Sequence, residues 1–286
     1  MQIHYFIFTN RTSKLKINKI EFTNLTLLVG ASGVGKTQIL NAILELKRIV
    51  NGWVTGNVEW EISFSTNSQN KYLWQGAFEL SEHPQKIQYE KIYLNDSLIV
   101  DRVKNETKFK GQITPKLSLQ KSIINLFNEE EVISPIYNDF NKIIISNELK
   151  LSPFTGDRFD NLLKQHITIE SIQNSMEDTF IKLALSNKNQ PKIFNEIKQR
   201  FIEIFQQVED IDFIYRKGIK FPLRLVLKEK KVSKLIYDYN ISSGMMKTLM
   251  QISNLFLSSA GTVILIDEFE NSLGINCIDI LTEDIL

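Results

Sequence analysis

The stretch GASGVGKT, Gly30–Thr37, fits the pattern G-x-x-x-x-G-K-[ST] at every fixed position. This pattern binds phosphate only where a strand leads into it and a helix follows it. The apolar run NLTLLV precedes the loop and predicts a buried strand. The segment TQILNAILELKRIV follows with apolar residues at helical spacing. The sequence therefore predicts an α/β fold built around a phosphate-binding loop.

The residues of the loop suit a nucleotide with its magnesium ion. Glycines let the backbone curl so that successive N–H groups face inward, and the helix N-terminus adds donors and a partial positive charge. Lys36 is expected to reach the β- and γ-phosphates and to assist catalysis, and the Thr37 hydroxyl to coordinate Mg²⁺. A glycine-rich turn that binds nothing is the alternative, and the flanking pattern argues against it. The predicted ATP-binding residues are Gly30, Ala31, Ser32, Gly33, Val34, Gly35, Lys36, Thr37 and Gln38.

Composition limits the class of protein. The chain has 286 residues, 43% of them hydrophobic, which is enough for a substantial buried core. Its formal net charge of +1 gives no globally basic surface, although a local basic groove for nucleic acid stays open. One cysteine, Cys277, excludes an intramolecular disulfide framework and suits a reducing cytosol. No apolar run approaches the roughly 20 residues of a membrane span, and MQIHYFIFTN lacks the features of a signal peptide. A cytoplasmic protein without membrane contact is expected.

Hydrophobic periodicity changes twice along the middle of the chain. From about residue 57 to 110 apolar and polar residues alternate, which predicts an antiparallel meander or an extension of the sheet that carries the loop. From about 116 to 207 apolar residues recur at helical spacing, and Pro191 provides a helix start signal. Strands are predicted again at DIDFIYRK, PLRLVLKE and VSKLIYDYN.

An acidic pair follows an apolar run near the far end of the sequence. Val263 to Ile266 predict a buried strand, and Asp267–Glu268 follow directly. A carboxylate at the end of such a strand lies at the edge of the sheet where α/β proteins bind ligands. Asp267 is therefore predicted to hold Mg²⁺, and Glu268 to accept a proton from the water that attacks the γ-phosphate.

A third element, ISSGMMKTLMQISNLFLSS, precedes this acidic pair. Ser243 or Ser242 is a plausible N-cap of a helix whose apolar face begins at Met246. In isolation this is a capped core helix. Its distance from the aspartate, 267 − 243 = 24 residues, gives it a further meaning.

With these three elements the chain resembles the ATPase head of soluble ATP-binding-cassette (ABC) proteins. That class includes RecF-like repair proteins, overcoming-lysogenization-defect nucleases, and the AAA-family ATPases of anti-phage and retron-associated systems. SSGMMK is similar to the signature loop, and DEFENSLG to the segment that joins Walker B to the D-loop at Asn271–Ser272–Leu273. Asn10–Arg11 matches in part an Asn-Phe-Arg-Ser element whose arginine approaches the nucleotide, so Arg11 is a further candidate.

The resemblance also implies a domain organisation. A single ABC-type head, 1–286, would have a mixed central sheet, with a nucleotide-binding core at about 1–50 and 234–286. An antiparallel β lobe would cover about 51–112, and a helical lobe with return strands about 113–233. Two family elements are not located: neither Gln75 nor Gln120 fits the glutamine loop well, and His4, His83 and His166 all lie upstream of the place of a switch histidine. The last strand and switch-histidine region of a complete head are therefore expected to be missing, which predicts a truncated chain or half of an active unit.

The resemblance further implies a head-to-tail dimer of this chain, closed by ATP and opened by hydrolysis. ATP held by Lys36, Thr37 and Asp267 of one subunit would be covered in trans by Ser243 and Gly244 of the other. The leading functional hypothesis is an ATP-driven switch in bacterial anti-phage defence that controls a nuclease or toxin effector. The alternatives are a RecF-like repair ATPase that binds DNA and a non-hydrolysing, nucleotide-dependent interaction module.

Overall fold

The structure is a computed structural model that describes residues 1–31, 33–54, 56–79, 85–104, 106–146, 156–215 and 223–267. The chain divides into two compact units. The sheet unit comprises Met1–Ile144 and Ala260–Leu265, and the helical unit comprises residues 145–259 with 266 and 267. Each unit has its own hydrophobic core.

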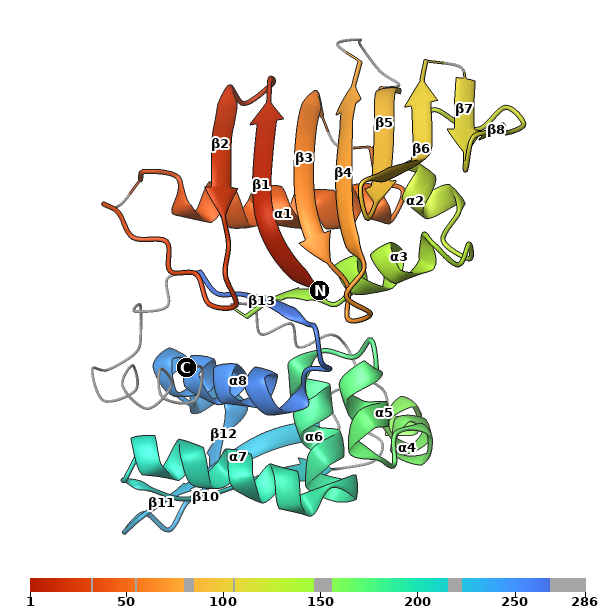
Figure 1. The fold of residues 1–286 in the computed structure, drawn as a ribbon. Helices are drawn as coiled ribbons and strands as arrows, with labels where there is room; N and C mark the ends of the chain where they lie inside the picture. The colour runs from red at the N-terminus through yellow and green to blue at the C-terminus, as the bar shows by residue number, and fades with distance from the viewer. Residues whose placement is uncertain are drawn as a thin grey trace. The chain divides into compact units, whose positions relative to one another are not determined.

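An eight-stranded sheet forms the frame of the sheet unit (Figure 1). Its order is β2-β1-β3-β4-β5-β6-β7-β8, and neighbouring strands pair antiparallel throughout. The predicted meander is confirmed, and it continues the N-terminal hairpin β1-β2. The strands are β1 Gln2–Asn10, β2 Leu15–Glu21, β3 Val58–Ser65, β4 Lys71–Phe78, β5 Ile87–Leu94, β6 Ser97–Val103, β7 Glu106–Phe109 and β8 Gln112–Ile113.

Among the described residues of the sheet unit, three helices accompany this sheet, and aromatic rings fill much of the core. They are α1 Lys36–Val50, α2 Ile123–Leu126 and α3 Ser134–Asn141. The rings of Trp60 and Trp74 meet edge to face at 5.1 Å, and Phe140 from α3 lies 5.4 Å from Trp74. A Cβ at Gly76 would approach the Trp60 ring to 2.3 Å, so only glycine lets this ring lie against β4. Period-two alternation on the strands thus produces one apolar face that binds the helices.

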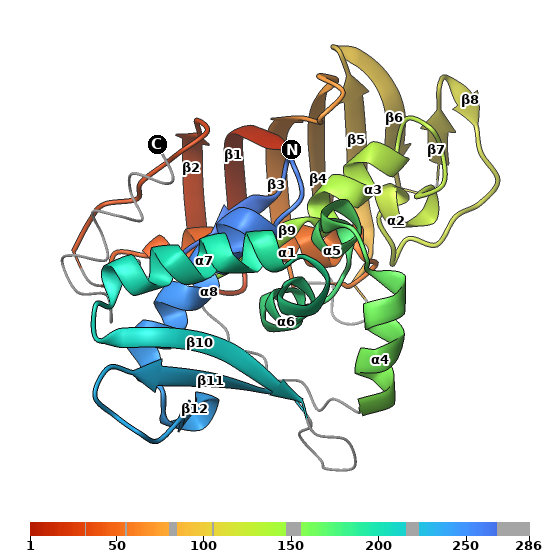
Figure 2. The same cartoon turned by 90° about the horizontal axis from the view of Figure 1, so that it is seen from below.

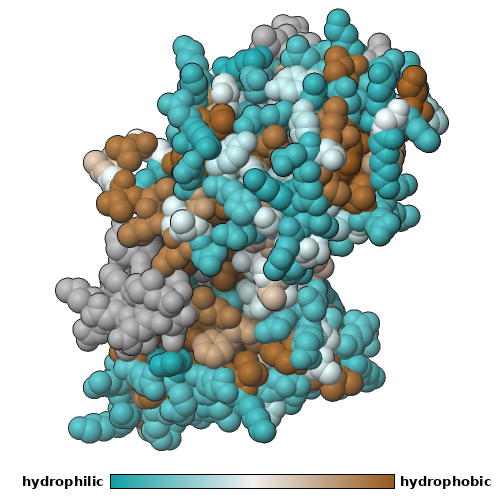
Figure 3. Space-filling model, viewed as in Figure 1, coloured by the Kyte–Doolittle hydropathy of each residue, from teal (hydrophilic) through white to brown (hydrophobic). Residues whose placement is uncertain are grey.

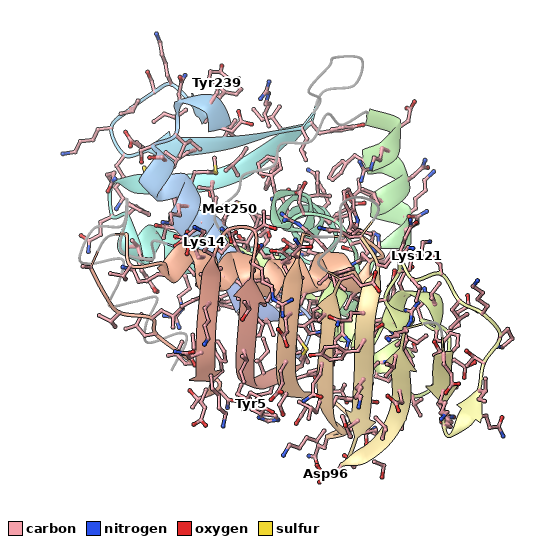
Figure 4. The ribbon with its side chains drawn as sticks, turned by 90° about the horizontal axis from the view of Figure 1, so that it is seen from above. Tyr5, Lys14, Asp96, Lys121, Tyr239 and Met250 are labelled. Atoms are coloured by element: carbon pink, nitrogen blue, oxygen red, sulfur yellow. The ribbon has the colours of Figure 1, made fainter. Side chains whose placement is uncertain are left out.

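The other face of the sheet is polar. Figure 4 shows Tyr5 on the side of the sheet away from α1. The Tyr5 hydroxyl donates to Glu61 at 2.7 Å, and the Gln75 amide donates to the same carboxylate at 2.8 Å. Burial, together with the neighbouring Glu61 carboxylate, raises the pKa of Tyr5 to about 12. These networks satisfy the polar residues that alternate with the core residues.

The helical unit contains five α-helices and a three-stranded antiparallel sheet among its described residues (Figure 2). The predicted helices are therefore confirmed between residues 156 and 204, and so are the returning strands. Pro191 is the first residue of α7, as its start signal predicted. The elements are α4 Gly156–Gln165, α5 Ile169–Asn174, α6 Thr179–Asn189, α7 Pro191–Ile204, β10 Val208–Tyr215, β11 Leu223–Glu229, β12 Ile236–Tyr237, the 3-10 helix η1 Asp238–Asn240 and α8 Ser243–Leu257.

The prediction of helices throughout residues 116–145 is wrong in part. Instead of continuous helix, this stretch contains the short helices α2 and α3 and the strand β9 Ile143–Ile145, which pairs with β13 Val263–Leu265. Pro135 lies in the first turn of α3, where a proline is tolerated, unlike in a helix interior. Consecutive isoleucines favour the strand that follows.

Candidate functional site

The glycines of the predicted phosphate loop have the backbone conformations that the loop requires. Gly33 and Gly35 have φ values of 83° and 98°, in the left-handed region that other residues rarely adopt. A Cβ at Gly30 would meet Val34 Cγ2 at 2.9 Å, but Val34 is 63% exposed and its side chain can move aside. The glycine pattern therefore has a structural reason at Gly33 and Gly35.

Helix α1 begins directly after the loop. Gly35 is its N-cap, and no side chain caps this end. The first turn carries no acidic residue, while Lys47 and Arg48 lie in the last turn, where they suit the helix dipole. The N-terminus of α1 thus keeps its partial positive charge directed at the loop, which is the arrangement that binds phosphate.

Lys36 closes the loop on itself in this structure. Its Nζ donates to the carbonyl oxygens of Gly30 at 2.5 Å and Ala31 at 3.0 Å. The ammonium group is therefore held above the turn. The motif spacing identified the lysine but carried no information on these hydrogen-bond partners.

The strand predicted before the loop is not formed. Residues 22–31 have no regular secondary structure, and Leu25, Leu27 and Val29 are exposed, Leu27 to 75% and Val29 to 85%. Figure 3 shows hydrophobic surface at the margin of the molecule where this segment lies. Thr23 forms a local turn, because its N–H donates to the Thr26 hydroxyl and its own hydroxyl donates to the Leu25 carbonyl. Such local bonds replace a ladder when no neighbouring strand is available.

The acidic end of the site is described only in part. Strand β13 forms as predicted, although it is short and half-buried, and Asp267 follows two residues after its end. Asp267 is half-buried and belongs to the helical unit, whereas the phosphate loop belongs to the sheet unit. Glu268 and the D-loop candidates Asn271, Ser272 and Leu273 lie outside the described residues. The meeting of Asp267 with the phosphate loop at one magnesium ion stays a prediction.

The signature-like segment forms a second helix N-terminus, at α8 in the helical unit. Ser242 is the N-cap, and its hydroxyl accepts from the Met245 N–H at 3.2 Å. Ser243 is exposed, and its hydroxyl makes no hydrogen bond to any described residue. The choice between the two serines is therefore resolved: Ser242 serves the helix, and Ser243 stays available to an external acceptor.

Arg11 and the two glutamine-loop candidates have partners within the sheet unit. Arg11 pairs with Glu59 at 2.9 Å beside the turn between β1 and β2. Gln75 donates to Glu61, and the Gln120 N–H donates to the Ser118 hydroxyl. Their predicted roles near the nucleotide stay untested.

The two described histidines also bond locally. His4 shares a 2.6 Å hydrogen bond with the Ser65 hydroxyl, and His166 Nδ1 lies 3.0 Å from the Ser171 carbonyl oxygen. His83 and Cys277 lie outside the described residues. Within the described ranges, no group of three or more His, Cys, Asp or Glu side chains is placed to hold a metal ion. No helix in the described part of the chain has the length and apolar character needed to cross a membrane.

One comparison with known proteins gives a match. A family model with the description "AAA domain, putative AbiEii toxin, Type IV TA system" matches residues 25–274. The match runs from the apolar segment before the phosphate loop to beyond Asp267. No curated protein matches the chain.

Proposed function

The chain belongs to this family of AAA domains, and from that premise we propose that it is an ATP-binding and ATP-hydrolysing switch subunit of the ABC type. The family consists of P-loop ATPases, which generally bind ATP with Mg²⁺. The observation that carries the proposal is the phosphate loop: two left-handed glycines, an uncapped helix start and a lysine held above the turn.

The chain supplies residues for each part of the nucleotide site. The backbone of residues 30–38 binds phosphate oxygens, and Lys36 exchanges its two carbonyl partners for them. Thr37 and Asp267 would provide the oxygen ligands that a magnesium ion prefers, and the ion would neutralise charge on the phosphates. Glu268 accepts the proton of the attacking water.

We further propose that ATP joins two copies head to tail. The free Ser243 hydroxyl and the N-terminal N–H groups of α8 suit a γ-phosphate that is bound by the partner copy. Because the Ser243 hydroxyl has no acceptor among the described residues, the closed dimer is the state in which we expect it to be used. ATP then favours the closed state in proportion to its differential affinity for the two states.

A trapped dimer tests this proposal. Glu268→Gln is expected to bind Mg-ATP, to hydrolyse it poorly, and to elute as a dimer in gel filtration with Mg-ATP. The matched control Glu268→Gln with Ser243→Arg keeps the phosphate loop and should bind ATP as a monomer, because a bulky cation replaces the hydroxyl. A monomeric Glu268→Gln variant in saturating Mg-ATP, or one that hydrolyses at the wild-type rate, contradicts the ABC-type mechanism.

The cellular role that we propose is bacterial defence against phage, in which the switch controls a nuclease or toxin effector. The support is the toxin–antitoxin description of the family. Phage plating on cells that carry the gene with its neighbouring genes tests the role. Protection is expected with the wild type and is expected to be lost with Lys36→Ala; equal plating on both strains contradicts it.

A further inference from the structure

The edge of the small sheet in the helical unit carries a concentration of positive charge. Residues 224–239 contain five basic and two acidic side chains, a net charge of +3, whereas the whole chain has +1. Lys230, Lys231 and Lys234 are exposed on the connection from β11 to β12 and form no ion pair with any described residue. Lys228, at the start of the same stretch, pairs with Glu209 at 2.7 Å.

Two tyrosines follow these lysines in the sequence. The rings of Tyr237 and Tyr239 are nearly parallel, with an interplanar angle of 8° and a centroid distance of 5.7 Å. Tyr239 is 67% exposed, and Figure 4 shows it at the outer margin of the helical unit. The Arg224 guanidinium lies 5.7 Å from the centre of the Tyr239 ring. An exposed aromatic face therefore lies beside one cation, in a stretch of sequence that carries four more.

A buried carboxylate fixes this arrangement. Asp238 is 7% exposed and lies between the two tyrosines in the sequence. It accepts a hydrogen bond from the Tyr239 N–H at 3.0 Å and pairs with Arg224 at 3.3 Å. Tyr237 is held by the sheet, since it pairs with Val226 of β11. The rings are thus presented by ordered backbone, which lowers the entropic cost of binding a ligand.

Protection of a sheet edge explains only part of the pattern. Edge strands often carry lysines that prevent pairing with other chains. That role needs no exposed, stacked rings, and large apolar groups on an edge would work against it. Two of the three acidic residues on β10 are paired, Glu209 with Lys228 at 2.7 Å and Asp210 with Lys198 at 2.9 Å, and Asp212 accepts from Asn187 at 3.0 Å. Lys230, Lys231 and Lys234 keep their charge, since they form no ion pair with any described residue.

We propose that this tyrosine–lysine surface, Arg224, Lys228, Lys230, Lys231, Lys234, Tyr237 and Tyr239, binds single-stranded nucleic acid. Unstacked bases lie on aromatic rings in such complexes, while cations follow the phosphates. A duplex keeps its bases stacked inside and cannot use the Tyr239 face. An acidic peptide would use the lysines without needing the rings. The inference does not depend on the nucleotide site and would stand if ATP hydrolysis were absent.

Fluorescence anisotropy with labelled oligonucleotides of about twelve nucleotides tests the proposal on the full chain. Oligo-dT, oligo-U and a duplex of equal length are compared at low salt. Tyr239→Ala should weaken single-strand binding about fivefold to a hundredfold, whereas Tyr239→Phe keeps the ring and should bind as the wild type does. Binding of oligo-dT, oligo-U or both supports the proposal, and the tighter of the two identifies the sugar preferred.

Charge-matched variants separate a defined surface from diffuse attraction. Changing Lys230, Lys231 and Lys234 to Glu should abolish binding, and changing them to Ala should lower the slope of log K against log salt by about 0.7 for each lost phosphate contact. The control changes Lys104, Lys108 and Lys110 to Glu; these lysines are exposed in the sheet unit. The proposal would be overturned if the control variant lost as much affinity, or if Tyr239→Ala bound the single strand as tightly as the wild type does. It would also be overturned if the duplex bound as tightly as the single strand, or if poly-glutamate bound more tightly.

Discussion

Two regions of the sheet unit, next to each other in the sequence, are built on opposite principles. In the eight-stranded sheet every strand has a neighbour, and Trp60 and Trp74 are almost completely buried. The segment that leads into the phosphate loop contains an equally apolar run, yet Leu27 and Val29 are exposed. The sheet obtains its stability from packing, whereas the loop obtains its shape from glycine conformation and from two bonds of Lys36. Stability and nucleotide binding should therefore respond to different residues.

The largest effect is expected inside the sheet, at a buried ion pair. Glu90 on β5 lies directly opposite Arg102 on β6, and Glu90 also accepts from Trp74 and from the Ser122 hydroxyl. Arg102→Met leaves this carboxylate without its counter-charge and should lower the free energy of unfolding by about 3–5 kcal/mol. Urea denaturation measures the loss, and affinity for ATP per folded molecule should not change.

A half-buried pair on the same strands provides the control. Lys91 and Asp101 approach to 3.8 Å on β5 and β6 and are only half-buried. Lys91→Met should change the stability by less than about 1 kcal/mol. If Arg102→Met and Lys91→Met are equally stable, the buried pair contributes no more to the stability of the sheet than the half-buried pair does.

The second effect belongs to the loop and should leave the fold intact. Lys36→Ala removes a charged donor from the phosphates and should raise the Kd for Mg-ATP at least about a hundredfold, or about 2.7 kcal/mol. Isothermal titration calorimetry measures the affinity, and the melting temperature should stay within a few degrees of the wild type. Lys110→Ala, which changes an exposed lysine elsewhere in the sheet unit, should leave the affinity unchanged. Unchanged affinity of Lys36→Ala would remove the phosphate-loop assignment.

The same contrast explains what the sequence could and could not predict. Alternation in NVEWEISFS and KIQYEKIYLN located β3 and β5, because local periodicity records which face of a strand is buried. It could not place Glu90 against Arg102, since cross-strand partners follow from register and not from the pattern of one strand. The loop glycines were identified from spacing alone, because Gly33 and Gly35 each supply their own backbone conformation. The run NLTLLV was misassigned because a strand exists only when another strand pairs with it.

A third, smaller effect concerns pH and the same buried carboxylate. Burial raises the pKa of Glu90 above its ordinary value of 4.5. Hydrogen bonds from Ser122 and Ile123 and the charge of Arg102 lower the pKa, but burial has the larger effect. The folded state then holds a proton that the unfolded state releases. This contribution to stability is complete below about pH 4.5 and is lost as the pH rises through the raised pKa.

Glu90→Gln should abolish this pH dependence. The free energy of unfolding of the wild type, relative to that of Glu90→Gln, should fall as the pH rises above 4.5. The fall should be about 1.4 kcal/mol for each unit by which the pKa of Glu90 is raised. Denaturation at several pH values measures these free energies of unfolding. Glu106→Gln, a change at an exposed position, should show the same pH dependence as the wild type. If the wild type instead became more stable relative to Glu90→Gln with rising pH, the pKa of Glu90 would be lowered and not raised.

The smallest expected effect tests whether the run before the phosphate loop contributes less to stability than the packed sheet does. Leu27 is exposed, so Leu27→Ser should change the free energy of unfolding by less than about 0.5 kcal/mol. Ile62→Ala in β3, where the side chain is completely buried, should cost about 2–5 kcal/mol under the same conditions. A loss of 2 kcal/mol or more at Leu27 would mean that the run before the phosphate loop is covered in the folded protein. The loop would then take its shape from packing as the sheet does, and nucleotide affinity should fall together with stability in that variant.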